Sequence, residues 1–152
     1  MRIQFESGSV LLVPAGAHRA LAVMTARAPF IAFYGCDRDP EPAEIPVLCS
    51  GRPLFVIGVD RAAYSNGYWG PMVVRLPEHN LPTIPPIFHQ NVFNGACSII
   101  EPGVSTRLLV PREECIGLER QASWSREHVE SRLTDHYEGR PNRWVEAMRV
   151  EL

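Results

Sequence analysis

Short runs of hydrophobic residues, separated by prolines and glycines, fill the first ninety positions of the chain. Several runs are rich in β-branched and aromatic residues, which is typical of strands buried in a sheet. The pattern predicts strands at 8–13, 30–36, 45–49, 52–60 and 72–76. The segment "AGAHRALAVMTARA" (15–28) has a helical composition and no internal proline. It predicts a first helix that Pro29 would end.

The second half of the chain has a different pattern. Residues 80–88 alternate prolines with apolar residues, which predicts an extended crossover because proline lacks the N–H that a helix needs. After Val110 the composition favours helices, at 111–122, 123–139 and 140–152. Strands followed by helices, without β-α-β alternation, predict an α+β fold. We expect an antiparallel meander sheet of about four strands within 30–90, with flanking helices.

Composition narrows the class of protein. A chain of 152 residues with 45% hydrophobic and 21% charged residues suits one globular domain, taken here as 1–152. The net charge of −2 argues against nucleic acid as the main partner. No apolar run approaches the roughly 20 residues that span a bilayer, and no secretory leader is visible at the N-terminus. We therefore expect a cytoplasmic protein without a membrane partner.

The chain has four cysteines, at positions 36, 49, 97 and 115. None forms a Cys-x-x-Cys pair, so a structural zinc site has little support. In a reducing cytosol all four should be thiols, and most such thiols are small buried hydrophobic groups. We expect Cys36, Cys49 and Cys115 to be of this kind.

The chain has 15 arginines and no lysine. One interpretation is a genome rich in G and C, whose codons favour arginine. The other is chemical: a lysine amine attacks activated acyl groups, whereas the guanidinium does not do so readily. A protein that carries a thioester would benefit from having no lysines.

The stretch "FHQNVFNGAC" (88–97) concentrates residues that could carry chemistry. A cysteine thiolate both accepts and releases acyl groups, which makes Cys97 a candidate nucleophile. Asn91 could donate a hydrogen bond to an oxyanion, and a turn at Asn94-Gly95 could bring it to the thiol. Each residue also has a structural interpretation. Cys97 could be a core thiol, Asn91 could cap a turn, and His89 could hold the loop by bonding backbone carbonyls.

The longer segment "VVRLPEHNLPTIPPIFHQNVFNGAC" resembles the central part of ubiquitin-conjugating enzymes. That family has a proline-containing turn, a Pro-Pro crossover, a His-Pro-Asn motif, and a glycine shortly before the acceptor cysteine. The matching positions are Leu76-Pro77, Pro85-Pro86, His89-Gln90-Asn91, Gly95 and Cys97, preceded by Tyr68-Trp69-Gly70. The resemblance covers residues 68–100.

The resemblance implies a conjugating enzyme of a divergent bacterial type. Cys97 would receive a ubiquitin-like protein from an activating, adenylating enzyme and pass it to an amine of a protein target. Asn91 would be the second catalytic residue, with His89, Asn94 and Gly95 in supporting roles. No metal or other cofactor is expected. Small operons of this kind occur in bacterial antiphage defence.

Two other functions are consistent with the same residues. The first is a non-catalytic binding module on the same scaffold, which Gln90 favours because it replaces the proline of the motif. The second is an unrelated α+β protein, such as a binding domain or a phage structural domain, with Cys97 buried. Solvent exposure of the Cys97 thiol separates the enzyme from the unrelated fold.

Overall fold

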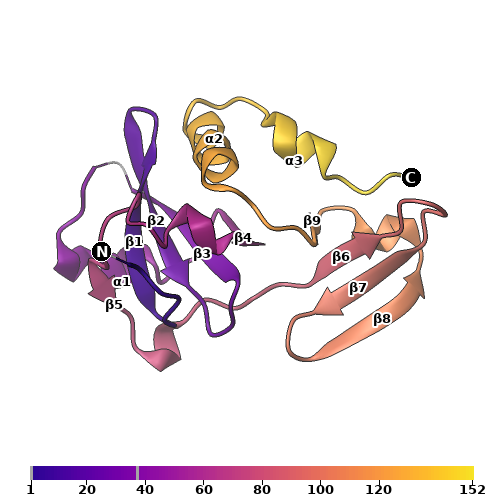
Figure 1. Cartoon of the computed structure of the whole chain (residues 1–152), viewed down its shortest axis with the longest axis horizontal. Coiled ribbons are helices and arrows are strands. Elements are labelled where there is room, and N and C mark those ends of the chain that lie inside the picture. Colours follow the sequence, from indigo (N-terminus) through magenta and orange to yellow (C-terminus); the bar gives the residue numbers. More distant parts are fainter. Residues whose placement is uncertain (1, 37) are drawn as a thin grey trace.

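The computed structural model describes residues 2–36 and 38–152, which form two β-sheets with the C-terminal helices above them (Figure 1). The first sheet has five strands in the order β4-β3-β2-β1-β5, and each strand is antiparallel to its neighbours. The strands are β1 (Ser9–Ala15), β2 (His18–Met24), β3 (Phe30–Cys36), β4 (Phe55–Gly58) and β5 (Val74–Arg75).

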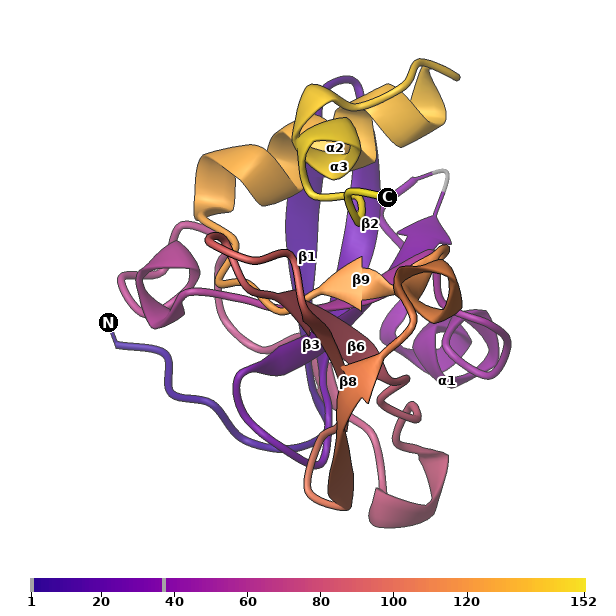
Figure 2. The ribbon, with the colours of Figure 1, turned by 90° about the vertical axis from the view of Figure 1, so that its right-hand side faces the viewer.

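The second sheet is smaller and stands beside the first (Figures 1 and 2). Its order is β8-β7-β6-β9, with antiparallel pairs except for the parallel pair of β6 and β9. The strands are β6 (Ile87–Gln90), β7 (Cys97–Glu101), β8 (Ser105–Val110) and β9 (Glu119–Arg120). An extended segment after β5 joins the two sheets, as expected from its prolines.

The described residues contain three α-helices and four short 3-10 turns. The helices are α1 (Ile45–Leu48), α2 (Arg126–Tyr137) and α3 (Arg143–Ala147). The 3-10 turns are η1 (Pro42–Glu44), η2 (Arg61–Ala63), η3 (Glu78–Asn80) and η4 (Arg112–Cys115). In the described ranges, none of the helices has the length and hydropathy needed to cross a membrane.

The first sheet is buried on both faces. On one face Leu11 and Phe33 pack with Val129 and Leu133 of α2. On the other face Leu21 packs in a second cluster, which includes Ile45 of α1 and Leu76 directly after β5, and Ile84 of the crossover packs against it. Because both faces are covered, successive residues along a strand are apolar, and the alternation that marks a half-exposed strand is lost.

Helix α2 is fixed at both ends. The Ser125 side chain accepts a hydrogen bond from the His128 amide, which caps the first turn. Near the other end, the Tyr137 hydroxyl donates to the Arg19 carbonyl and accepts from the Cys36 amide, so it links the helix to β2 and β3. These contacts hold α2 across the first sheet (Figure 2).

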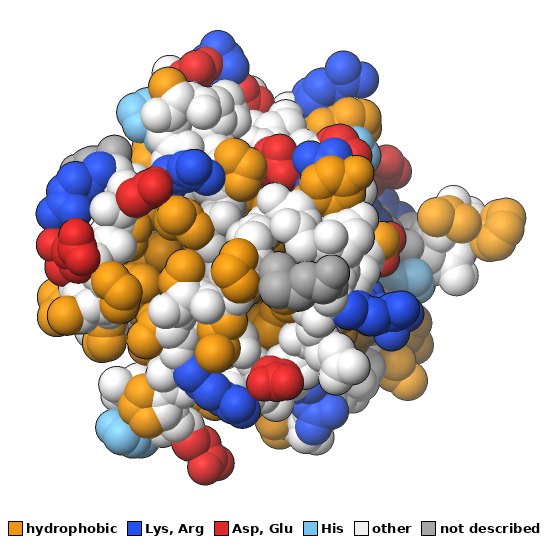
Figure 3. Space-filling model, turned by 60° about the vertical axis from the view of Figure 1, so that its left-hand side comes forward, with side chains coloured by type: hydrophobic (Ala, Val, Ile, Leu, Met, Phe, Trp, Pro, Cys, Tyr) orange, Lys and Arg blue, Asp and Glu red, His pale blue; other side chains and the backbone are white. Residues whose placement is uncertain are grey.

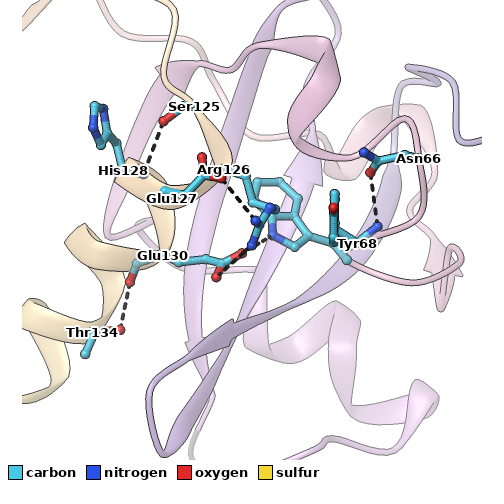
Figure 4. A network of polar contacts seen from close by, with 9 residues as sticks. Asn66, Tyr68, Ser125, Arg126, Glu127, His128, Glu130 and Thr134 are labelled. Carbon is cyan, nitrogen blue, oxygen red and sulfur yellow. Dashed lines mark hydrogen bonds and ion pairs between the residues drawn. The ribbon is translucent and has the colours of Figure 1, made fainter.

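A network of polar contacts joins the first turns of α2 to the loop before β5 (Figure 4). The Trp69 indole donates to the Glu130 carboxylate at 3.0 Å, and Arg126 donates to the same carboxylate at 3.2 Å. The Arg126 guanidinium also lies over the Tyr68 ring, 4.2 Å from its centre. The aromatic-glycine segment that resembles a conjugating enzyme thus has a structural role, which is to fix α2 to the body of the protein.

One ion pair connects α2 to the second sheet. Arg132 donates two hydrogen bonds to the Glu119 carboxylate, at 2.9 and 2.7 Å, and its guanidinium lies over the Phe55 ring. Paired bonds of this kind are stronger and more directional than a single contact. Because Glu119 belongs to β9, α2 orients both sheets.

Two predicted elements near the N-terminus are wrong. Residues 15–28 do not form a helix, because β1 and β2 make a tight hairpin whose turn contains Gly16 at φ 65°. The alanine-rich composition favoured a helix in the prediction. Alanine also fits in a strand such as β2, whose sheet is covered by other elements on both faces. Residues 45–49 form α1 and not a strand, because Pro42 and the capping carboxylates Glu41 and Glu44 start a helical turn just before it.

The predicted sheet is correct in class and wrong in extent. It has five strands and not four, and it begins at Ser9, well before the predicted range of 30–90. The helix predicted at 111–122 is limited to η4 and followed by β9, with Gly117 at φ 85° between them. The strands predicted at 8–13, 30–36, 52–60 and 72–76 are confirmed as β1, β3, β4 and β5, although β4 and β5 are shorter than predicted. The helices within 123–139 and 140–152 are also confirmed.

The contact between α2 and the first sheet gives a stability prediction. Leu133→Ala should lower the free energy of unfolding by about 2–5 kcal/mol, because Leu133 is fully buried and its loss leaves a cavity. Leu108→Ala removes the same atoms from an exposed position and should change it by less than about 0.5 kcal/mol. Urea titrations followed by tryptophan fluorescence measure both, and equal losses would contradict this role of α2.

Candidate functional site

The predicted site residues lie together at the turn between β6 and β7. Strand β6 ends at Gln90 and β7 begins at Cys97, and these two residues are partners in the ladder. The turn is closed by two backbone bonds, from the Asn91 amide to the Ala96 carbonyl at 2.8 Å and from the Gly95 amide to the Asn91 carbonyl at 2.9 Å. The turn predicted at Asn94-Gly95 is present, with Gly95 at φ 74°.

Both asparagines of the turn hold its backbone. The Asn91 side-chain oxygen accepts from the amides of Phe93 and Asn94, at 2.8 and 3.2 Å. The Asn94 side-chain oxygen accepts from the Ala96 amide at 2.9 Å. These are Asx turns, in which a short side chain replaces a backbone acceptor. The geometry supports the turn-capping interpretation of Asn91, and its amide nitrogen has no acceptor within the described ranges.

His89 does not share a face with Cys97. His89 is exposed and pairs with Ser98, one position away from the pair of Gln90 and Cys97. Successive side chains of a strand point to opposite faces of the sheet. The imidazole therefore lies on the other face from the thiol and is not placed to take its proton.

A cysteine that acts as a nucleophile should lie on an accessible loop, but Cys97 lies in a strand. It is the first residue of β7, and only 1% of it is exposed. It packs with Phe88, Ile99 and Cys115, and its thiol donates a weak hydrogen bond to the Gly95 carbonyl at 3.6 Å. The thiol is buried because pairing with Gln90 directs it to the inner face of the second sheet.

The other three cysteines are buried thiols, as expected. Burial, together with the neighbouring Cys97 thiol, raises the pKa of the Cys115 thiol to about 11. Burial also raises the pKa of the Cys49 thiol to about 12. Because only the thiolate is a strong nucleophile, these raised pKa values argue against Cys49 and Cys115 as nucleophiles near neutral pH.

Gln90, which replaces the proline of the motif, anchors the C-terminal segment. Its amide donates to the Glu151 carbonyl at 2.8 Å, and its oxygen accepts from the Glu151 amide at 2.9 Å. The same amide donates to the Gly95 carbonyl at 3.2 Å. A proline could make none of these bonds, so glutamine has a specific structural role here.

Two features of this region were not found from the sequence. The first is the outer edge of the second sheet, where β8 exposes Leu108 and Leu109 to solvent. The second is a pair of arginines beside the turn, Arg112 and Arg120. No periodic pattern of hydrophobic residues in the sequence marks either feature. Only the pairing of the strands shows which side chains have no element packed over them.

Other kinds of site have less support. Within residues 2–36 and 38–152, no three histidine, cysteine or acidic side chains lie close enough to hold a metal ion. Figure 3 brings forward the side of the first sheet, where basic and acidic groups are interspersed with hydrophobic ones. A face with mixed charges is not the basic surface that nucleic-acid binding requires.

Comparison of the chain with family models, curated proteins and solved structures gives no match in any of the three. A proposal for the function therefore depends on the geometry of the chain itself. The second sheet is the region where that geometry is most unusual, because it combines a tight capped turn, half-buried arginines and an exposed apolar strand.

The two interpretations of Asn91 predict different effects of substitution. If the side-chain oxygen caps the turn, Asn91→Ala should lower the free energy of unfolding by about 1 kcal/mol, as expected for a lost hydrogen bond. Asn91→Asp keeps the oxygen and removes the amide, so it should preserve the stability of the turn. Thermal or urea unfolding of both variants measures this. Equal destabilisation by both would contradict the capping role.

Proposed function

We propose that this chain is a protein-binding module that takes up an extended segment of its partner as an additional strand on β8. The observation that carries the proposal is the exposure of β8, in which every residue from Ser105 to Leu109 is exposed. An open strand edge carries N–H and C=O groups that pair readily with another extended chain.

Strand β8 has a partner strand on one side only. It pairs with β7, and no backbone hydrogen bond from β8 to another strand occurs within the described ranges. Natural proteins usually protect such an edge with charges, proline, β-bulges or a covering element, and β8 has one charged side chain, Arg107, and one register shift but no covering strand within the described ranges. Here Leu108 and Leu109 are 73% and 82% exposed. An incoming strand would therefore find both backbone groups and apolar side chains.

The backbone at Leu109 supports a functional interpretation. Leu109 has φ 54°, and it lies where the register between β7 and β8 shifts. A branched side chain in this left-handed region costs about 1–2 kcal/mol relative to the right-handed one. A glycine would fit without strain. Strained residues of this kind concentrate at binding and catalytic sites, where the conformation serves a purpose other than stability.

The position of β8 leaves room for a partner. The second sheet lies to one side of the first, and β8 is its outermost strand (Figure 1). Val104, at the end of the β7–β8 connection, is a further exposed apolar residue near this edge. Together these residues form an apolar border along an open strand, which suits recognition of an extended peptide.

Substitutions in β8 test the proposal. Ligands would first be selected from a display library of short random peptides. Replacing Leu108 and Leu109 together by aspartate should weaken binding of a selected peptide by about 10- to 100-fold, because two apolar contacts are lost. Stability should change by less than about 0.5 kcal/mol, because both side chains are exposed. Fluorescence anisotropy measures the affinity.

Two controls make this test specific. Val47→Asp introduces a charge at an exposed apolar position on α1 and should leave the affinity unchanged. A peptide N-methylated at alternate residues cannot form the backbone ladder and should lose binding. Binding that survives N-methylation, or that Val47→Asp weakens as much as the β8 variant does, would argue against strand addition.

The second candidate is the ubiquitin-conjugating function, with a thioester on Cys97. It is favoured by the turn, which brings Asn91 and Cys97 to the two ends of one short loop. The absence of lysine is consistent with it. The fold would then be of the ubiquitin-conjugating type, and residues 91–96 would have to move to uncover the thiol.

Thiol reactivity separates the two candidates. If Cys97 is a core thiol, iodoacetamide should modify it in the native protein at least about 10²-fold more slowly than in urea, because reaction requires opening of the structure. A conjugating enzyme should instead show Cys97 reacting ahead of Cys36, Cys49 and Cys115. Peptide mass spectrometry follows each site. A thioester formed with an activating enzyme, a ubiquitin-like protein and ATP, and lost in Cys97→Ser, would establish the second candidate.

A further inference from the structure

Two half-buried arginines lie beside the β6–β7 turn without an acidic partner. The other half-buried arginines each form an ion pair, Arg19 with Asp39, Arg126 with Glu130, and Arg132 with Glu119. Arg112 and Arg120 form none with any carboxylate in the described ranges. A partly desolvated positive charge is costly unless it is paired, so these two positions favour a negative group from outside the chain.

Backbone oxygens hold both guanidinium groups in place. Arg112 donates to the carbonyls of Glu151 and Asn94, at 3.3 and 3.5 Å. Arg120 donates to the carbonyls of Met148 and Arg149 and to the side-chain oxygen of Gln90. The Arg120 guanidinium also lies over the Phe88 ring, 4.8 Å from its centre. These neutral acceptors and the ring orient the groups without cancelling their charge. Each guanidinium has five N–H donors, so each keeps donors for a further acceptor.

The two arginines line one cavity of about 380 Å³. The turn forms its wall, including Val92 and Phe93, which are 86% and 95% exposed. Glu151 also lines the cavity, but its carboxylate forms no ion pair with either arginine within the described ranges. The cavity therefore combines two oriented positive charges, one acidic group and an apolar rim.

We propose that this cavity binds an acidic side chain of a peptide whose neighbouring residues are apolar. The guanidinium fork matches a carboxylate, and an ion pair formed in a partly buried cavity is less screened than one at the surface. Exposed Val92 and Phe93 would pack against the residues that flank the acid. The proposal rests on charge and cavity alone, and it holds whether or not a strand adds to β8.

A matched pair of peptides tests the charge requirement. The probes are acetyl-Phe-Glu-Phe-amide and acetyl-Phe-Gln-Phe-amide, which differ only in the central charge. They would be titrated into the isotope-labelled full chain and followed by NMR. The glutamate peptide should shift the amides of 90–95 and the Nε–H signals of Arg112 and Arg120. The glutamine peptide should bind at least about 10-fold more weakly than the glutamate peptide. Equal binding of both would overturn the proposal.

Variants of the chain assign the site. Arg112→Gln and Arg120→Gln should each weaken binding of the glutamate peptide by about 10-fold. Arg143→Gln removes the same charge from an exposed position on α3 and should leave binding unchanged. Weakening by Arg143→Gln equal to that of the other two would show a general charge effect and overturn the site.

The arginine variants also remove hydrogen bonds to the C-terminal segment, so they could weaken binding by loosening it. Glu151→Gln tests the site without removing those bonds. It removes the one carboxylate that lines the cavity and retains the backbone bonds to Gln90. It should strengthen binding of the glutamate peptide by about 2- to 5-fold, and unchanged or weaker binding would count against the site. Inorganic phosphate is the final probe. If phosphate shifts the same signals and the glutamate peptide does not, the peptide assignment is wrong.

Discussion

Burial of the first sheet on both faces is the constraint on which the rest of the structure depends. Strand β2 has no exposed residue from Ala20 to Met24, so a layer must cover each side. Helix α1 and the crossover cover one face, and α2 covers the other. Because α2 comes near the end of the chain, the residues between β5 and α2 must leave the first sheet and return. The second sheet is formed by that excursion.

The second sheet accordingly has a limited core of its own. Its central cluster contains Phe88, Cys97, Ile99 and Cys115, and the C-terminal segment closes it through Gln90. This core buries the inner face of the second sheet. It does not extend to β8, whose side chains from 105 to 109 stay exposed. The same geometry explains two features that look unrelated in the sequence. The cysteine is hidden because it faces inward, and the leucines are exposed because they lie on the last strand.

The chemistry of the β6–β7 turn depends on which of its polar groups already have hydrogen-bond partners within the protein. The oxygens of Asn91 and Asn94 are occupied by backbone amides, and Gln90 is occupied by the C-terminal segment. The groups left without an oppositely charged partner in the described ranges are cationic, because the guanidinium groups of Arg112 and Arg120 donate only to neutral oxygens. The region that resembles a catalytic loop is therefore better suited to recognise a negative group than to activate a nucleophile.

The sequence by itself determined the α+β class, the strand at 30–36, the two C-terminal helices and the turn at Asn94-Gly95, because these depend on local signals such as caps, turn residues and aromatic runs. It predicted β1 at 8–13 but assigned β2 to a helix, because an alanine-rich strand that is buried on both faces shows neither alternation nor an aromatic run. The sequence also predicted that Asn91 and Cys97 lie close to one turn, but it did not show that the Cys97 thiol faces inward. Only the tertiary structure decided which side chains are covered, since the pairing of β6 with β7, and the position of β8 at the edge, fix the direction of every side chain in the second sheet.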